Sequence, residues 1–389
     1  MYKNYFIVAF RNLIRNKTFT FINVFGLALS MSVCLLVLMR LKDQLSYDDF
    51  HKNSDRLYRI TTKVTNPTGQ DQLFATTPIL LSEKLQKDYA LVEDVARISP
   101  LRGREYTDGK KKLKLNTAFT DPGFFKLFSF RLEAGNKTSV LNAPNSIVLT
   151  HHSAQNFFGK EQAIGKILTI KDVGDLVVTG VLAETTDKSH IEFDGYISMN
   201  TLRTFENAAK LPKLSDDWNR GTESYTYVML KDQASVKQLE AATASISAFL
   251  LKDMKLKGRE SMLYRVQPFD KIILGEEMMF SMGNTGTMGK VGAEIAIGLV
   301  ILLSACFNYT NLSIARSVNR GKEVGVRKVA GAMRGQIFQQ FIIESVVLTM
   351  LSLGVGYLIL RLLTDYSPLG QEMGAPDSAY DPMLFLWFF

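Results

Sequence analysis

Three long apolar runs interrupt the sequence, one near the N-terminus and two in the last quarter. Residues 18–39 and 295–315 contain no charged residue, and residues 337–360 contain one, Glu344. A helix of about 20 apolar residues covers the ~30 Å hydrocarbon core of a bilayer. The pattern therefore predicts three transmembrane helices, over 18–39, 294–315 and 337–360.

The first run differs from a signal peptide. It is longer than a typical signal-peptide core, and the next residues are the charged sequence RLKD rather than a small-residue cleavage site. We therefore expect the chain to keep this run as a membrane anchor. A buried helix of a soluble protein is the alternative interpretation for each run, and it fits the third run, with its acid, better than the other two.

Between the first two runs the pattern is that of a domain folded in water. Charges return, and short segments show the two-residue period of strands or the longer period of helices. Strands are predicted at 57–64, 112–119, 147–149, 167–170, 176–181 and 225–230, helices at 78–89 and 235–251, and an aromatic turn or helix at 124–130. Residues 40–293 are expected to form a mixed α+β domain of two lobes, large enough for its own core. The glycine-rich residues 281–289 are predicted to be a hinge before the second span.

The net charge of +8 is concentrated in two places. Residues 1–40 contain five basic residues and no acid, and residues 316–334 contain six basic residues against one acid, Glu323. Basic flanks mark the cytoplasmic side of spans, and two spans separate these segments, so both are predicted to be cytoplasmic. The predicted fold class is therefore an α-helical transmembrane protein with a large mixed α+β extracytoplasmic domain inserted between spans 1 and 2. A nucleic-acid binder would gather its excess charge in one patch, so no nucleic acid is expected as a partner.

The first 17 residues have the pattern of a cytoplasmic amphipathic helix. One arc of the helical wheel is apolar: Tyr2, Phe6, Phe10, Leu13 and Ile14. The opposite side contains Asn4, Arg11, Asn12 and Arg15, with Val8 as the apolar exception. Such a helix is expected to lie in the membrane interface, with Arg11, Arg15 and Lys17 toward lipid headgroups. A simple positive anchor that only fixes topology is the alternative.

The C-terminal part ends on a short apolar run. Residues 361–381 are expected to form an extracytoplasmic loop, and residues 382–389 (PMLFLWFF) begin a new apolar segment. Eight residues are too few to span a bilayer. We expect a chain cut inside a fourth span; the alternative is a tail that enters only the interface.

Candidate chemistry is sparse. The histidines are His51, His151, His152 and His190. Adjacent histidines in a strand would point to opposite faces, which is poor for shared metal ligation, so no metal site is expected. Both cysteines, Cys34 and Cys306, fall in apolar runs, which excludes a disulfide or thiolate site in the α+β domain.

Catalytic motifs also fail to match. Serines 146, 153 and 189 lie near histidines in the sequence, but none is in a G-x-S-x-G turn. The segment GNTGTMGK resembles a phosphate-binding loop, yet Asn284 and Val291 stand where that motif needs glycine and serine or threonine. We therefore expect a non-catalytic chain without a bound cofactor of its own.

Several short motifs follow one another in a set order along nearly the whole chain. They occupy residues 9–17, 21–28, 43–51, 55–60, 146–150, 158–159, 164–166, 178–181, 189–190, 323–332 and 344–345. Together they resemble the permease subunits of ABC transporters of the MacB/FtsX/LolC-like class, particularly the versions common in Bacteroidetes. Gln44 departs from the pattern, because an acid is common there.

The resemblance implies a mechanism and partners. Such permeases dimerise in the bacterial inner membrane, with the N-terminus cytoplasmic and the large domain periplasmic, and a separate ATPase subunit binds ATP and docks on their cytoplasmic face. ATP-driven closure moves the spans and, through them, the periplasmic domains, for export of peptides, antibiotics or lipoprotein-like substrates. A periplasmic adaptor and membrane lipids are further expected partners. Family members have four spans, or eight where the unit is repeated.

The same resemblance assigns a role to the cytoplasmic segment 316–336. From its residues alone, docking on a partner and fixing topology are equally compatible with a basic loop that holds one acid. The resemblance implies a coupling loop against the ATPase, formed by Arg320, Glu323, Gly325, Arg327, Lys328, Gly331 and Ala332. Two alternatives stay open: an FtsX-like regulator that activates a cell-wall hydrolase, and a membrane-anchored extracytoplasmic enzyme or sensor.

Overall fold

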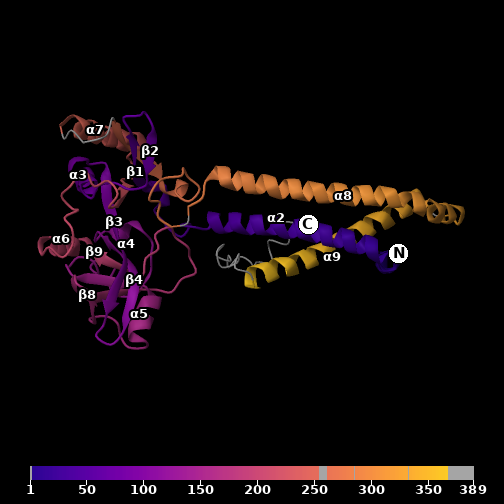
Figure 1. Cartoon of the computed structure of the whole chain (residues 1–389), viewed down its shortest axis with the longest axis horizontal. Helices are drawn as coiled ribbons and strands as arrows, with labels where there is room; N and C mark the ends of the chain where they lie inside the picture. The colour runs from indigo at the N-terminus through magenta and orange to yellow at the C-terminus, as the bar shows by residue number, and fades with distance from the viewer. Residues whose placement is uncertain (1, 254–260, 284, 332, 367–389) are drawn as a thin grey trace. The chain divides into compact units, whose positions relative to one another are not determined.

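The computed structural model describes residues 2–253, 261–283, 285–331 and 333–366. The chain divides into two compact units (Figure 1). The helical unit combines residues 1–45 with the C-terminal part from Met288 onward, and the α+β unit is Ser46–Thr287. The insertion of an α+β unit between the first and second long helices is the predicted architecture.

In the described residues of the helical unit there are one short and three long helices. They are α1 (Tyr2–Arg15), α2 (Lys17–Leu45), α8 (Met288–Val329) and α9 (Arg334–Tyr366). Segments of α2, α8 and α9 are long and apolar enough to cross a membrane, and they contain the three predicted spans. The predicted N-terminal helix is α1, and a single residue, Asn16, separates it from α2.

The helix α2 packs against both α8 and α9. Met31, Leu35 and Leu353 form part of a buried cluster between α2 and α9. A Cβ on Gly356 of α9 would lie 2.7 Å from the carbonyl oxygen of Ala28 on α2. Glycine thus allows the two backbones to approach, as small residues do between membrane helices.

The segment predicted as a loop at 316–336 is mostly helical. Helix α8 continues without a break to Val329, and α9 begins at Arg334. Gly321 and Gly325 therefore lie inside a helix, where each costs roughly 1 kcal/mol relative to alanine. Gly331 has a φ of +88°, the left-handed conformation that ends many helices. The loop was predicted from its three glycines, but only the last of them, Gly331, lies at the end of the helix.

The α+β unit is built on a mixed sheet of eleven strands in the order β11-β1-β10-β3-β4-β9-β6-β8-β5, with β2 paired to β1, and β7 to β3 and β8. The strands are β1 (Leu57–Thr65), β2 (Asp71–Phe74), β3 (Val92–Thr107), β4 (Lys112–Thr120), β5 (Leu132–Ala134), β6 (Ser146–Leu149), β7 (Ile167–Ile170), β8 (Gly174–Leu182), β9 (Gly195–Ser198), β10 (Tyr225–Leu230) and β11 (Ser261–Pro268). The helices are α3 (Leu80–Asp88), α4 (Phe124–Leu127), α5 (His151–Phe158), α6 (Met199–Asn207) and α7 (Val236–Asp253), with short 3-10 turns η1 (Ser54–Arg56) and η2 (Phe269–Lys271).

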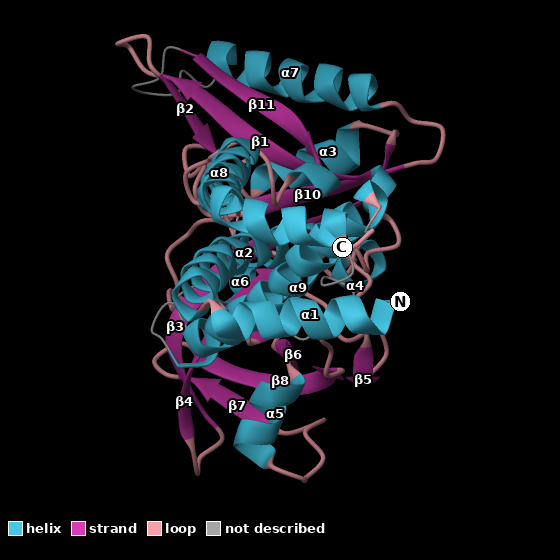
Figure 2. Ribbon diagram, turned by 90° about the vertical axis from the view of Figure 1, so that its right-hand side faces the viewer, coloured by secondary structure: helices cyan, strands magenta, loops and turns pink. Residues whose placement is uncertain are grey.

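Two lobes share the long strand β3. Its first half pairs with β10, and its second half pairs with β4 and β7. Figure 2 shows α7 along β1 and β11 in one lobe and α5 beside β7 and β8 in the other. Each lobe has a buried apolar cluster, and a third, aromatic cluster contains Phe124, Phe128 and Tyr227. The predicted mixed α+β domain with its own core is therefore confirmed.

Candidate functional site

A buried polar cluster lies where the first residues of the α+β unit meet its central strands. Asp48 is 6% exposed, and His190 and Tyr227 are fully buried. One oxygen of Asp48, Oδ2, lies 2.6 Å from Nδ1 of His190, and His190 Nε2 lies 2.7 Å from the hydroxyl oxygen of Tyr227. The other oxygen, Oδ1, accepts hydrogen bonds from the Ser189 hydroxyl at 2.5 Å and from the His190 backbone N–H at 3.2 Å.

The protonation states follow from burial and charge. Burial alone raises the pKa of Asp48, but the attraction of His190 and hydrogen bonds from His190, His51 and Ser189 outweigh it and hold the pKa well below its usual range. Burial lowers the pKa of His190 despite the nearby carboxylate. Burial also raises the pKa of Tyr227, which therefore remains protonated. An ionised Asp48 thus accepts a proton-bearing Nδ1, and a neutral His190 accepts the Tyr227 hydroxyl at Nε2.

A buried cation, Arg59, lies on the strand next to that of Tyr227. Arg59 is 1% exposed, and its Nε and Nη2 donate to Oε1 of Gln267 at 3.0 and 2.7 Å. The strand register places Arg59 opposite both Tyr227 on β10 and Gln267 on β11. Arg59 forms no ion pair with a carboxylate in the part of the chain that the structure describes. We call Asp48, Arg59, Ser189, His190 and Tyr227 the junction cluster; its one cation and one anion balance.

The last residues of the α+β unit reach the same place. Gly283 has a φ of +71°, and a Cβ there would lie 2.6 Å from the carbonyl oxygen of His190 and 2.8 Å from its Cα. Two residues nearby are also bonded within the unit: the Phe280 carbonyl accepts from the Tyr225 hydroxyl at 2.7 Å, and Met279 exchanges backbone hydrogen bonds with Leu73 and Ala75. The first and last segments therefore both contact the Ser189–His190 dipeptide.

The geometry of the cluster is unsuited to nucleophilic catalysis. The Ser189 hydroxyl donates to Asp48, and the nitrogen that would activate a nucleophile, Nε2 of His190, is held by Tyr227. Both hydrogen-bond partners of His190, Asp48 and Tyr227, lie in the interior, out of reach of a substrate. The hydrogen bonds hold the Asp48 carboxylate and the His190 ring in fixed positions, so the cluster has a structural role.

The other histidines do not gather at a metal site. His151 and His152 open helix α5, whose N-cap is Thr150, and so the strand assumed for them was wrong. His151 Nδ1 lies 2.7 Å from Oε2 of Glu133, and this hydrogen bond raises the pKa of the histidine. Among the described residues no group of three or more histidines, cysteines or acids has the geometry to hold a metal ion.

A cavity of about 760 Å³ lies beside the junction cluster. Its wall includes Tyr47 and Phe50, which flank Asp48, together with Ser189 and Ile191, which flank His190. Side chains on either side of the buried cluster are thus accessible from this cavity, while His190 itself is not.

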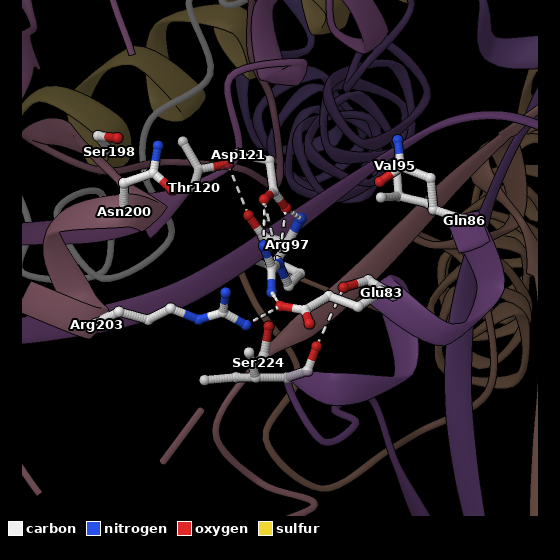
Figure 3. A network of polar contacts seen from close by, with 12 residues as sticks. Glu83, Gln86, Val95, Arg97, Thr120, Asp121, Ser198, Asn200, Arg203 and Ser224 are labelled. Atoms are coloured by element: carbon white, nitrogen blue, oxygen red, sulfur yellow. Dashed lines mark hydrogen bonds and ion pairs between the residues drawn. The ribbon is translucent and has the colours of Figure 1, made fainter. Parts of the chain in front are cut away.

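A second polar network joins elements of both lobes (Figure 3). The guanidinium of Arg97 on β3 bonds to both carboxylate oxygens of Asp121, which follows β4, and to Oε1 of Glu83 on α3 at 2.6 Å. Arg203 on α6 donates to the same Glu83 oxygen at 2.5 Å. Burial alone would lower the pKa of Arg97, but the two carboxylates reverse this, so the group is always charged.

In the helical unit, the predicted span acid has a defined partner. Glu344 on α9 is buried, and the side-chain amide of Asn12 on α1 donates to its two oxygens at 3.1 and 3.2 Å. Asn16 in turn donates to Oδ1 of Asn12 at 3.1 Å. The polar arc of α1 is therefore divided: Asn12 faces the bundle, whereas Arg11, Arg15 and Lys17 are exposed.

The apolar arc of α1 is divided as well. Leu13 is buried in a cluster with Leu27 and Leu348, whereas Ile7, Phe10 and Ile14 remain exposed. The sequence analysis predicted one continuous apolar surface for this arc. In the structure one edge of the helix binds α2 and α9, and the exposed apolar edge is free to contact lipid.

The residues predicted to couple to an ATPase lie at the α8–α9 end of the helical unit. Lys328 and Gly325 are exposed on α8, and Nη1 of Arg327 donates to Oε1 of Gln340 on α9 at 2.5 Å. The side chains of Arg320 and Glu323, and residue Ala332, lie outside the described part of the chain, as do residues 367–389.

Two family models match the chain. Residues 20–246 match the MacB-like periplasmic core domain, and residues 295–389 match the FtsX-like permease C-terminal domain. The chain belongs to the MacB/FtsX class of ABC transporter permeases. The two matched regions correspond to the α+β unit with its preceding helix and to the α8–α9 part of the permease.

Curated relatives agree with this assignment. The ABC transporter permease YknZ of Bacillus subtilis is 24% identical over 74% of this permease and 62% of its own length. The macrolide export ATP-binding/permease protein MacB of Campylobacter jejuni is 23% identical over 67% of this permease and 38% of its own length. The chain thus spans less than two thirds of each of these relatives.

Solved structures resemble the α+β unit. A domain of a permease protein from Porphyromonas gingivalis has a TM-score of 0.47 at 19% identity, covering 56% of this permease and 91% of that chain. The periplasmic region of MacB from Actinobacillus actinomycetemcomitans has a TM-score of 0.38 at 16% identity, covering 55% of this permease and 90% of that chain.

The junction cluster draws on three sequence motifs that the family resemblance already contained. Asp48 lies in 43–51, Arg59 in 55–60, and Ser189 and His190 form 189–190. The sequence analysis gave these motifs no role, because residues 140 positions apart showed no sign of contact. Tyr227 was missed altogether, since it is one of several aromatic residues in a buried strand. The signal available was a charged residue, Arg59, inside a predicted strand.

Proposed function

We propose that this chain is the transmembrane subunit of an ABC transporter in the bacterial inner membrane, and that it couples ATP hydrolysis by a separate subunit to motion of its α+β unit. The observation that carries the proposal is the order of parts: a helix long enough to span a membrane enters the α+β unit, and a second such helix leaves it. The clusters of basic residues support a cytoplasmic N-terminus and a periplasmic α+β unit.

The contact with the ATPase is assigned to the end of the α8–α9 hairpin. Arg320, Glu323, Gly325, Arg327, Lys328, Gly331 and Ala332 are the proposed coupling residues. Because α8 is helical to Val329, Arg320 and Glu323 belong to a continuous helix. A helix transmits a displacement along its axis better than a loop does, which supports a coupling role.

The other proposed partners are supported by the exposed surface of α8 and by the names of the MacB relatives. Only 11% of the apolar window of α8 is buried, against 44% in α2. This supports contact of α8 with lipid or with a second permease copy, as expected for a dimer. The name of the MacB relatives, macrolide export proteins, supports export of an antibiotic-like substrate. Peptide-like substrates and a periplasmic adaptor are proposed from the family resemblance alone. ATP is assigned to the partner ATPase, and this chain is proposed to be non-catalytic.

Co-purification tests the proposal. The full-length gene is expressed with the neighbouring ABC ATPase, and a stable complex that hydrolyses ATP is expected after extraction in detergent. The charge reversal Glu323→Lys should abolish co-elution and leave membrane insertion intact. The matched control is Glu161→Lys, at an exposed acid of the α+β unit, which should co-elute normally. A well-folded permease that never binds the ATPase would contradict the proposal and favour an anchored sensor or enzyme.

A further inference from the structure

The α+β unit has two covalent connections to the membrane helices, and both are attached to one dipeptide. At the first connection, the Asp48 backbone N–H donates to the carbonyl of Lys188 at 2.8 Å, and the Asp48 carboxylate binds Ser189 and His190. At the second, Gly283 lies against the backbone of His190 so closely that a Cβ would overlap it. Asp48 and Gly283 are 235 residues apart in sequence.

The local backbone supports a fixed arrangement at both connections. Asp48 has a φ of 63°, Phe280 a φ of 57° and Gly283 a φ of +71°. A left-handed conformation is unfavourable for residues other than glycine and persists where the surroundings impose it. At Asp48 the surroundings are the five groups that bond to its carboxylate and backbone. The first connection is therefore held by specific bonds, and the second by a position that only glycine fits.

The dipeptide is in turn bonded to the centre of the sheet. His190 Nε2 accepts the hydroxyl of Tyr227 on β10, and the register places Arg59 of β1 opposite Tyr227. Strand β10 pairs with both β1 and β3, the strand that the two lobes share. A displacement delivered to His190 thus reaches the strands that organise both lobes.

We propose that His190 is the positioning residue that couples the two connections, so that movements of the first and second spans are delivered to the α+β unit at one site. This rests on the proposed function, because it describes how motion of the helices reaches the α+β unit. The unit then moves as one body, since its two ends are attached to each other. Without this attachment the same movements would separate the first segment from the last.

Hydrogen exchange in the full-length permease, reconstituted in nanodiscs without the ATPase, tests the coupling. Gly283→Ala places a methyl group against His190, and we expect the backbone amides of Asp48 and His190 to exchange about five- to tenfold faster, as loss of one buried hydrogen bond would cause. The matched control is Gly69→Ala, which has the same left-handed backbone, with a φ of +77°, but no atom within 4 Å of the added Cβ. It should accelerate exchange only in its own turn.

A reciprocal variant keeps the test decisive if Gly283→Ala does not fold. Asp48→Asn keeps the size of the side chain and removes its charge, and it should accelerate exchange of the Met279 amide at the other connection. Unchanged exchange at the distant connection in both variants would overturn the proposal, as would an equal effect of Gly69→Ala. Because no ATPase is present, a positive result stands even where the complex with the ATPase fails to form, and the two proposals fail separately.

Discussion

The two units of this permease distribute polar and apolar side chains in opposite ways. In the helical unit Phe21 is 68% exposed, while Asn23 and Ser352 are buried. In the α+β unit the large aromatic side chains fill the interior and most charges lie outside. In lipid, burial of an apolar side chain brings no gain in free energy, so membrane helices pack through small and polar residues. In the α+β unit, contact with water drives apolar side chains into the interior. Each unit is therefore arranged for its own solvent.

The difference extends to buried charges. In the α+β unit the buried carboxylate Asp121 meets a guanidinium, and the junction cluster contains one cation for its one anion. In the helical unit the buried carboxylate Glu344 is bonded by the neutral amide of Asn12. A charge far from water is costly unless it is paired or well bonded. Among the described contacts, an ion pair meets this requirement at Asp121, and the amide of Asn12 contributes to it at Glu344.

The largest effect is expected from breaking the buried pair of Arg97 and Asp121. Asp121→Ala leaves the guanidinium of Arg97, 9% exposed, without its bidentate partner, and removal of one member of a buried pair costs about 3–5 kcal/mol. Thermal unfolding followed by circular dichroism should show a strongly lowered midpoint. The control Asp71→Ala removes an acid from an exposed pair with Lys63 and should leave the midpoint nearly unchanged. Equal effects of the two variants would refute the difference claimed for buried charges.

A smaller effect is expected in the helical unit. Asn12→Ala removes two hydrogen bonds to Glu344, and hydrogen bonds to a charged group contribute about 1.5–3 kcal/mol. Helix α1 should detach from α9, so its amides should exchange faster while those of α2 stay protected. Arg15→Ala, at an exposed position of the same helix, is the control. Normal protection of α1 in Asn12→Ala would show that apolar contacts of Leu13 hold the helix alone.

The smallest effect concerns pH and the junction cluster. Asp48, Arg59, His51 and Tyr227 surround His190, and its folded pKa lies below the ordinary value of 6.5. As the pH falls below that value, the unfolded chain takes up a proton that the folded state resists, so stability declines, at up to about 1.4 kcal/mol per pH unit for one group. Unfolding measured between pH 7.5 and 5.5 should show this decline, and His190→Gln should reduce it.

A second histidine contributes with the opposite sign. The pKa of His151 is raised by its hydrogen bond to Glu133, so its contribution is present at low pH and is lost as the pH rises through the folded value. This pair is exposed, and the effect is therefore screened. In the His151→Gln variant, which removes this contribution, a stability that rises on acidification would contradict the lowered pKa of His190.

The sequence predicted the spans and most strands, because both follow from local periodicity. Strand β3 was missed because its second half contains Pro100, Gly103 and several charges, which local rules exclude from a central strand. The structure accommodates them where the pairing with β4 shifts register between Leu101 and Arg104. Strand β11, which follows a stretch of charges, was not predicted.

The site was less predictable than the fold. Glu344 could be singled out, since an acid in an apolar run is visible in any sequence, but its partner Asn12 is 332 residues away. The junction cluster brings together residues from the beginning of the α+β unit, from the loop before β9 and from β10. Such contacts depend on which strands become neighbours, and local periodicity carries no information about that.

The uninterrupted length of α8 has a mechanical consequence. Its 42 residues make a rod of about 63 Å, of which the 14 residues after Ala315 account for roughly 21 Å. A tilt of a few degrees in the apolar part therefore sweeps the far end through an arc of an ångström or more. Under the proposed coupling role the helix would act as a lever arm, so inserting or deleting turns beyond Ala315 would change the displacement of its far end and would also shift the contact of Arg327 with Gln340.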